Sequence, residues 1–137
     1  MTSYIFHNEN EMILWAKDFA KALNAPVVIA LHGDLGIGKT TIARAIINEL
    51  CGDTIVPSPT FTIVQEYDVT HYALRVTHYD LYRIKDKSEL VEIGLMDAIA
   101  NNITIIEWPE IAMDILPKNT IHIYIGEFES GRKLFLQ

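Results

Sequence analysis

Apolar residues recur at helical spacing in two segments near the start of the chain. The first covers residues 12–23, and Asn8 with Glu11 is placed as a capping box before it. The second covers residues 39–51 and is followed by Gly52, a residue type common just after a helix. The pattern therefore predicts two amphipathic helices. Their apolar positions are Met12, Trp15, Ala16, Phe19, Ala20 and Leu23 in the first, and Ile42, Ala43, Ile46, Ile47 and Leu50 in the second.

Two short runs are apolar at nearly every position, unlike a strand with one face in water. They are residues 27–31, which follow Pro26, and residues 103–106. Such runs are typical of parallel strands that are covered on both faces. Between them, residues 88–100 return to helical spacing with a break at Gly94, which predicts a pair of short helices.

Alternating and β-branched positions predict two further strand pairs. Residues 61–67 and 72–79 are β-rich and are separated by a polar turn, so they are expected to form an antiparallel hairpin. Residues 121–125 alternate, residues 126–131 offer a turn, and residues 133–136 can return beside the first run. The order of all these strands in the sheet stays open.

Composition limits the classes of protein that are compatible with this pattern. The 137 residues suit one domain (1–137), and 50% are hydrophobic, enough for an ordinary core. The net charge of −7 disfavours strong direct binding to RNA or DNA. The single cysteine, Cys51, excludes an intramolecular disulfide and is expected to be a buried structural thiol. No apolar stretch approaches the roughly 18 residues of a membrane span, so a cytoplasmic protein without membrane contact is expected.

The strongest chemical signal is a glycine-rich loop between the predicted strand at 27–31 and the predicted helix that begins at Lys39. Its spacing, Gly33-x-x-x-x-Gly38-Lys39-Thr40, matches the phosphate-binding loop of P-loop proteins. Glycines let backbone N–H groups surround phosphate oxygens, and the following helix directs its positive end toward them. The residues expected to bind ATP or ADP are Gly33, Asp34, Leu35, Gly36, Ile37, Gly38, Lys39, Thr40 and Thr41.

Side-chain roles within this loop follow from residue type. Lys39 is expected to place its charge at the β- and γ-phosphates, and the Thr40 hydroxyl to bind Mg²⁺. Asp34 is assigned to shaping the loop rather than to the metal. Mg²⁺ also needs an acidic partner, and Glu107 directly follows the buried run at 103–106. Glu107 is the predicted metal ligand, with a solvated carboxylate as the alternative.

A second acidic residue, Asp80, ends an alternating segment and shares one predicted sheet face with His78. Asp80 either binds Mg²⁺ through water, orients the attacking water, or serves as a turn or helix-cap carboxylate. His78 is either catalytic or simply packed and hydrogen-bonded. Thr60, in a proline-marked loop, either senses the γ-phosphate or belongs to an extended entry into a strand. Trp108 either reports nucleotide state or is a partly buried packing residue.

Five motifs in this order resemble the bacterial TsaE (YjeE) family, the tRNA threonylcarbamoyladenosine biosynthesis ATPases. They are GDLGIGKTT at 33–41, SPTF at 58–61, HYDLYR at 78–83, IGL at 93–95 and IEWP at 106–109. Nearly the whole chain is covered. The resemblance implies a single P-loop α/β domain with a mainly parallel central sheet, helices on both faces and an antiparallel hairpin.

The same resemblance implies an activity and partners. It implies an ATPase, weak alone, that works with the TsaD and TsaB synthase subunits to modify adenosine 37 of tRNA and meets tRNA only through them. It also implies Mg²⁺ at Thr40 and Glu107, a role for Asp80 in hydrolysis, and Thr60 in a switch-like loop. Trp108 joins the functional residues on the same ground, and Lys39, assigned above from its residue type, is counted with Asp80 and Thr60 as catalytic.

The chain departs from the family pattern at a few positions. Ile37 stands where Ala is usual, and Met12 where Thr is common, which leaves the adenine end of the pocket open. Arg132 matches a basic position near the nucleotide, although a surface arginine is the alternative.

Three other functions use a similar loop. A small-molecule kinase needs an acceptor pocket and an arginine-bearing lid, for which little chain remains. A GTP-dependent switch normally carries an Asn-Lys-x-Asp motif, which does not occur here. A module that binds nucleotide without hydrolysing it stays open.

Overall fold

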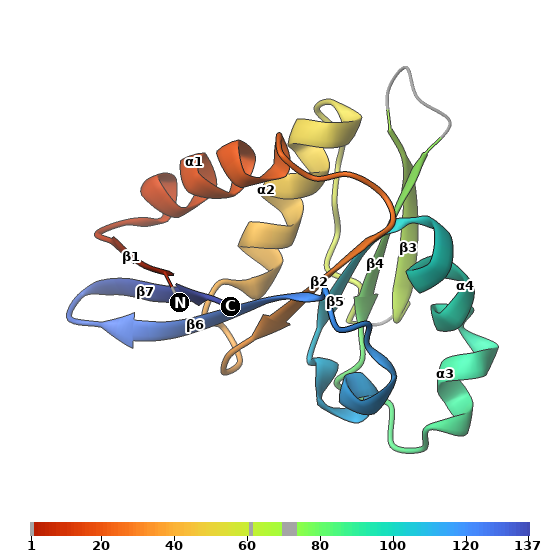
Figure 1. Cartoon of the computed structure of the whole chain (residues 1–137). Coiled ribbons are helices and arrows are strands. Elements are labelled where there is room, and N and C mark those ends of the chain that lie inside the picture. Colours follow the sequence, from red (N-terminus) through yellow and green to blue (C-terminus); the bar gives the residue numbers. More distant parts are fainter. Residues whose placement is uncertain (1, 61, 70–73) are drawn as a thin grey trace.

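A seven-stranded mixed sheet forms the centre of the computed structural model, which describes residues 2–60, 62–69 and 74–137 (Figure 1). The strand order is β1-β7-β6-β2-β5-β4-β3. The strands are β1 (Thr2–Phe6), β2 (Val27–His32), β3 (Val64–Asp68), β4 (Arg75–Asp80), β5 (Ile103–Glu107), β6 (Ile121–Phe128) and β7 (Gly131–Leu136).

The middle of the sheet is parallel and both flanks are antiparallel. β2 pairs in parallel with β5 on one side and β6 on the other, and β5 pairs in parallel with β4. The β3–β4, β6–β7 and β1–β7 pairs are antiparallel. This confirms the predicted α/β class with a parallel centre, and it supplies the strand order. The carboxyl ends of β2, β5 and β4 consequently meet at one edge of the sheet.

Helices cover the two faces unequally. Helices α1 (Glu9–Ala20) and α2 (Lys39–Cys51) pack side by side on one face. The short helices α3 (Ser88–Glu92) and α4 (Leu95–Asn101) and the 3-10 helix η1 (Pro109–Ile115) cover the other face beneath the strands around β5. Two apolar cores result, one on each side of the sheet. The predicted break at Gly94 is confirmed, with φ of 69° at that residue.

The first helix, α1, begins three residues before the predicted apolar pattern of residues 12–23 and also ends three residues before that pattern ends. Asn8 caps α1, since its side chain accepts a hydrogen bond of 3.0 Å from the Glu11 N–H. The Glu11 carboxylate accepts from the His7 N–H at 2.8 Å, one residue earlier than a standard capping box requires. The helix ends at Ala20 in a turn.

The hairpin predictions are confirmed in outline and corrected in detail. β3 and β4 are antiparallel, while the expected strand starts at Phe61 and Tyr72 lie outside the described residues. At the other hairpin the turn is shorter than predicted. Gly126 belongs to β6, and the chain reverses at Glu129, whose φ is 54°. The pairing of β6 with β7 therefore extends further than the sequence pattern suggested.

Two elements were not predicted. β1 pairs with β7, so Thr2 lies opposite Leu136. η1 follows β5 directly and begins at Pro109. Cys51 is partly rather than fully buried, and burial raises the pKa of its thiol to about 11. Within the described residues, no helix is both long and apolar enough to cross a bilayer.

Candidate functional site

The glycine-rich loop leaves β2 and turns sharply into α2. Gly33 has φ of 154°, and a Cβ there would lie 2.8 Å from the Ile125 carbonyl oxygen. Gly38 has φ of 125°, and a Cβ there would lie 2.7 Å from the Met12 methyl carbon. Both positions thus require glycine for backbone conformation, and Gly33 also requires it for space because its close neighbour is backbone rather than the flexible end of a side chain. The loop can approach a ligand with backbone N–H groups because these glycines carry no side chain.

Lys39, the first residue of α2, is only 4% exposed. Its ammonium donates hydrogen bonds to the backbone carbonyls of Gly33 and Asp34, the latter at 3.0 Å. The same nitrogen lies 3.6 Å from the centre of the Trp108 ring. Burial lowers the pKa of Lys39, and nearby carboxylates, first that of Glu107, oppose this shift. The side chain is thus a compact cation held inside the curve of the loop.

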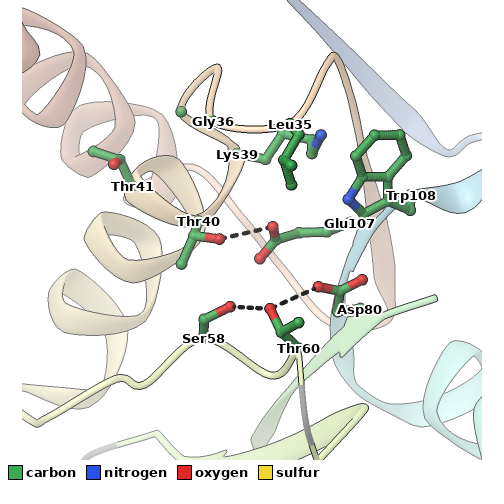
Figure 2. A pocket seen from close by; sticks show the side chains of 11 residues that line it. Leu35, Gly36, Lys39, Thr40, Thr41, Ser58, Thr60, Asp80, Glu107 and Trp108 are labelled. Carbon is green, nitrogen blue, oxygen red and sulfur yellow. Dashed lines mark hydrogen bonds between the residues drawn. The ribbon is translucent and has the colours of Figure 1, made fainter. Parts of the chain in front are cut away.

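Thr40 and Glu107 face each other across the sheet edge (Figure 2). The Thr40 hydroxyl donates to Glu107 Oε1 at 2.8 Å, and Oε2 lies 2.6 Å from His78 Nε2. Glu107 is 3% exposed, so it is a buried carboxylate with both oxygens engaged. The alternative of a solvated carboxylate is therefore wrong.

Asp80 lies directly beside Glu107, because the two residues are paired at the ends of β4 and β5. Its Oδ1 accepts from the Tyr82 N–H at 2.9 Å, and its Oδ2 accepts from the Thr60 hydroxyl at 3.3 Å. The Thr60 hydroxyl in turn lies 2.7 Å from that of Ser58. Asp80 therefore stabilises the turn at Tyr82, and it also holds the hydroxyl groups of Thr60 and Ser58 at the site.

One cavity of about 240 Å³ joins these groups. It is bounded by the glycine loop and the start of α2 on one side and by the ends of β4 and β5 on the other. The sequence-predicted residues that line it are Leu35, Gly36, Gly38, Lys39, Thr40, Thr41, Thr60, Asp80, Glu107 and Trp108. Ser58 also lines it and was not predicted as a site residue.

A second cavity of about 220 Å³ lies on the other side of the glycine loop. Gly36, Gly38 and Thr41 line both cavities. Ile37 and Arg132 line only the second, where Arg132 Nε donates to the Ile37 carbonyl at 2.8 Å. Arg132 is thus a loop contact rather than a free surface arginine. The wall also includes Met12, the residue that left the adenine end of the pocket open in the sequence. Four further wall residues carry no sequence signal for this role: Asn8, Glu9, Ser130 and Gly131.

Two predicted residues line neither cavity. Gly33 lies beneath the loop against Ile125, and Asp34 is exposed. Their backbone carbonyls accept hydrogen bonds from the Lys39 ammonium, so both residues shape the loop. Trp108 adopts a left-handed conformation with φ of 56°, and its ring contacts that of Tyr82 at a centroid distance of 4.8 Å.

The residues fit a phosphate–magnesium group by their chemistry. The loop supplies a buried cation and glycine-turned backbone, and the Thr40 hydroxyl adjoins a buried carboxylate. Mg²⁺ in nucleotide sites is usually held by one or two carboxylates together with phosphates and waters. The described residues contain no group of three or more His, Cys, Asp and Glu side chains arranged for a metal. The Thr40–Glu107 pair is thus the arrangement expected where phosphates complete the ligand set.

The strand, glycine-rich loop and helix, together with acidic residues at the ends of adjacent strands, define a mixed α/β fold with a candidate phosphate-binding loop. The family described as "Threonylcarbamoyl adenosine biosynthesis protein TsaE" matches residues 6–134. The chain belongs to this TsaE family.

Individual relatives are similar to this chain over most of their own length. The "tRNA threonylcarbamoyladenosine biosynthesis protein TsaE" of Rickettsia bellii is 39% identical over 131 residues, covering 95% of this chain and 90% of the relative. The protein of the same name from Haemophilus influenzae is 34% identical, covering 99% and 88%. The crystal structure of Bacillus subtilis YdiB is similar with a TM-score of 0.78 and 27% identity, covering 97% of this chain and 82% of that one.

Proposed function

We propose that this protein binds ATP with Mg²⁺ and hydrolyses it in support of tRNA threonylcarbamoyladenosine biosynthesis. The observation that carries the proposal is the convergence of Lys39, Thr40, Glu107 and Asp80 on one cavity beneath a glycine-rich loop. The names of the relatives support the biosynthetic role. The buried charge of Lys39 and the geometry of the glycine loop support nucleotide binding.

In this proposal the triphosphate lies along the loop. Backbone N–H groups at the start of α2 donate to phosphate oxygens, aided by the positive end of the helix. Lys39 moves its ammonium from the loop carbonyls to the β- and γ-phosphates, whose oxygens are stronger acceptors. The nucleoside end enters the second cavity, which is bordered by Met12 and Arg132 and shares Gly38 and Thr41 with the first. ADP occupies the same places without the γ-phosphate.

Thr40 Oγ1 and Glu107 Oε1 are the side-chain atoms that would hold Mg²⁺. They lie 2.8 Å apart at the cavity wall, a separation suited to two neighbouring ligands of one ion. When bound, Mg²⁺ supplies positive charge that neutralises the phosphate oxygens as the terminal bond breaks.

Hydrolysis requires a water molecule placed in line with the γ-phosphorus. Asp80 and Thr60 lie on the cavity side opposite the loop, so we assign them to orienting this water. The water oxygen forms a bond to phosphorus, the bond to the bridging oxygen breaks, and ADP and phosphate are the products. Asp80 Oδ2 accepts the proton of this water. The hydrogen bond that the Thr60 hydroxyl donates to Oδ2 holds the carboxylate in position.

The partners in this proposal are the TsaD and TsaB synthase subunits, with tRNA met through them in the cytoplasm. Two exposed side chains with large apolar surfaces lie beside the site: Leu35, which lines the cavity and is 80% exposed, and Tyr82, which contacts Trp108 and is 58% exposed. Such exposed apolar groups are suited to a protein partner that covers the nucleotide. The net charge of −7 is consistent with indirect contact to tRNA.

The test is the steady-state rate of ATP hydrolysis with Mg²⁺, measured alone and then with TsaD, TsaB and tRNA. We expect a low rate alone and a sharp rise with the complete set of partners. Omitting each partner in turn identifies which one stimulates the reaction. A partner-independent rate, or phosphate transfer to a small acceptor, would contradict the proposal.

A further inference from the structure

His78 is the most deeply buried histidine near the site, with an exposed fraction of 0% in the middle of β4. Its Nε2 lies 2.6 Å from Oε2 of Glu107, which is itself 3% exposed. His78 lies two residues before Asp80 on the same face of the strand, behind the cavity wall rather than in it. The imidazole thus touches the proposed metal ligand from outside the cavity lining.

The two oxygens of Glu107 have different partners. Oε1 accepts from the Thr40 hydroxyl at 2.8 Å, and Oε2 accepts from His78. An ionised carboxylate only accepts hydrogen bonds, so the imidazole proton that serves this contact is carried on Nε2. The carboxylate is held at both ends, with Oε1 directed to the cavity and Oε2 directed into the protein.

The other ring nitrogen shows that the histidine is not there for packing alone. His78 Nδ1 is buried and finds no hydrogen-bond partner within the part of the chain that the structure describes. A buried polar atom without a partner costs free energy, which an apolar side chain of similar volume would avoid. The contact with Glu107 is the interaction that offsets this cost.

We infer that His78 is the positioning residue for the magnesium-binding carboxylate. By holding Oε2, it leaves Oε1 as the single oxygen that can reach the ion beside Thr40. The inference rests on the proposed function, in which Glu107 binds Mg²⁺. Groups that orient a metal ligand from behind commonly change metal affinity by about 10- to 100-fold when removed.

The experiment uses the full chain and measures ATP affinity as a function of Mg²⁺ by calorimetry. His78→Leu keeps the volume and removes the donor, whereas His78→Gln keeps an N–H donor at a comparable reach. Thr104→Val is the matched control, since it removes a buried hydroxyl from β5 that bonds to the Ala98 carbonyl away from the cavity. Thermal unfolding of each variant separates stability from metal binding.

We expect the Mg²⁺ concentration at half-saturation to rise by about tenfold or more in His78→Leu and to stay within about threefold in His78→Gln. ATP affinity in chelator should be unchanged in both. Thr104→Val should lower the melting temperature without moving the Mg²⁺ midpoint. In a Glu107→Ala background, His78→Leu should have no further effect on that midpoint, because its action passes through Glu107.

Three results would overturn the inference. An unchanged Mg²⁺ midpoint in His78→Leu would do so, as would equal losses in His78→Leu and His78→Gln. If His78→Leu does not fold, nitrogen NMR of the wild-type ring decides, and a proton on Nδ1 alone contradicts the inference. Wild-type ATP binding that does not depend on Mg²⁺ would instead remove the proposed metal site itself, so the two failures are distinguishable.

Discussion

The Thr40 hydroxyl donates to the Glu107 carboxylate although 67 residues separate them in the chain. The contact exists because β2 and β5 are neighbouring parallel strands, with Leu31 opposite Glu107. β2 leads into the glycine loop and α2, so the start of that helix comes to rest above the end of β5. This relationship connects the phosphate loop to its proposed metal ligand, and the predictions below depend on it.

Replacing Lys39 with Ala should weaken ATP binding by about 100-fold, since a buried cation and its charge-assisted hydrogen bonds are lost. Calorimetry measures the affinity. Lys118→Ala, at an exposed lysine, is the control and should bind as the wild type does. An affinity for Lys39→Ala within about threefold of wild type would contradict the phosphate-loop assignment.

Glu107→Gln should raise the Mg²⁺ requirement for ATP binding by about tenfold or more, because the amide lacks the negative charge that Mg²⁺ prefers. Affinity in chelator should not fall, since the buried carboxylate repels phosphate. A titration of ATP affinity against Mg²⁺ measures both. Superimposable wild-type and mutant titrations would move the metal ligand to Asp80 or to water.

Asp80→Asn should lower partner-stimulated hydrolysis by about 100-fold or more, as expected when a proton acceptor is lost. Its amide oxygen can still accept from the Tyr82 N–H, so folding and ATP affinity should be retained. Single-turnover hydrolysis measures the loss. Asp86→Asn is the control, since that carboxylate caps a surface turn at Ser88 and should not affect the rate. Normal turnover in Asp80→Asn would exclude the proposed role.

Trp108 fluorescence should change on addition of ATP or ADP, because Lys39 lies 3.6 Å from its ring centre and is expected to move toward phosphate. The chain has two tryptophans, and the other, Trp15, packs against Phe19 in the core. Trp108→Phe should abolish the change and Trp15→Phe should retain it. A nucleotide-dependent signal that survives in Trp108→Phe would place the response elsewhere.

Stability should fall in mild acid because of His32. Burial, and then the charges of His122 and Lys39, lower the pKa of His32 from 6.5 to about 4. Between these values the unfolded chain binds a proton that the folded protein does not. The contribution of His32 is therefore complete above about pH 6.5 and is lost as the pH falls toward 4.

The expected loss is about 1–2 kcal/mol, reduced from the full linkage value because the ring is only partly buried. Urea unfolding at pH 7 and pH 4.5 measures it. His32→Gln should flatten the pH dependence, while His7→Gln, at an exposed histidine, should leave it unchanged. An equal slope in wild type and His32→Gln would contradict the prediction.

Local sequence patterns predicted the elements that depend on neighbouring residues. Helix α2 and its terminal Gly52, the break at Gly94 and the buried runs in β2 and β5 all agree with the structure. Each involves a periodicity or a turn residue whose effect is felt within a few positions. The glycine loop was predictable for the same reason, since its conformation is set by the spacing of its own glycines.

The missed features depend on partners far away in the chain. β1 is a short edge strand, and its pairing with β7 joins Thr2 to Leu136. The second cavity combines the start of α1, the glycine loop and the β6–β7 turn, so Asn8 and Ser130 carry no local signal for it. The turn predicted over residues 126–131 is shorter in the structure because Gly126, a common turn residue, is accommodated inside β6.

The class of fold and the glycine-rich loop could be predicted from the sequence, because hydrophobic periodicity and glycine spacing act locally. The sequence also singled out Asp80 and Glu107 as acids after strands, without deciding how they are used. The fold was needed to show that these carboxylates are neighbours, that Thr40 and His78 contact different oxygens of Glu107, and that Arg132 supports the loop. Strand order and register bring such groups together, and both depend on packing of the whole sheet rather than on any one segment.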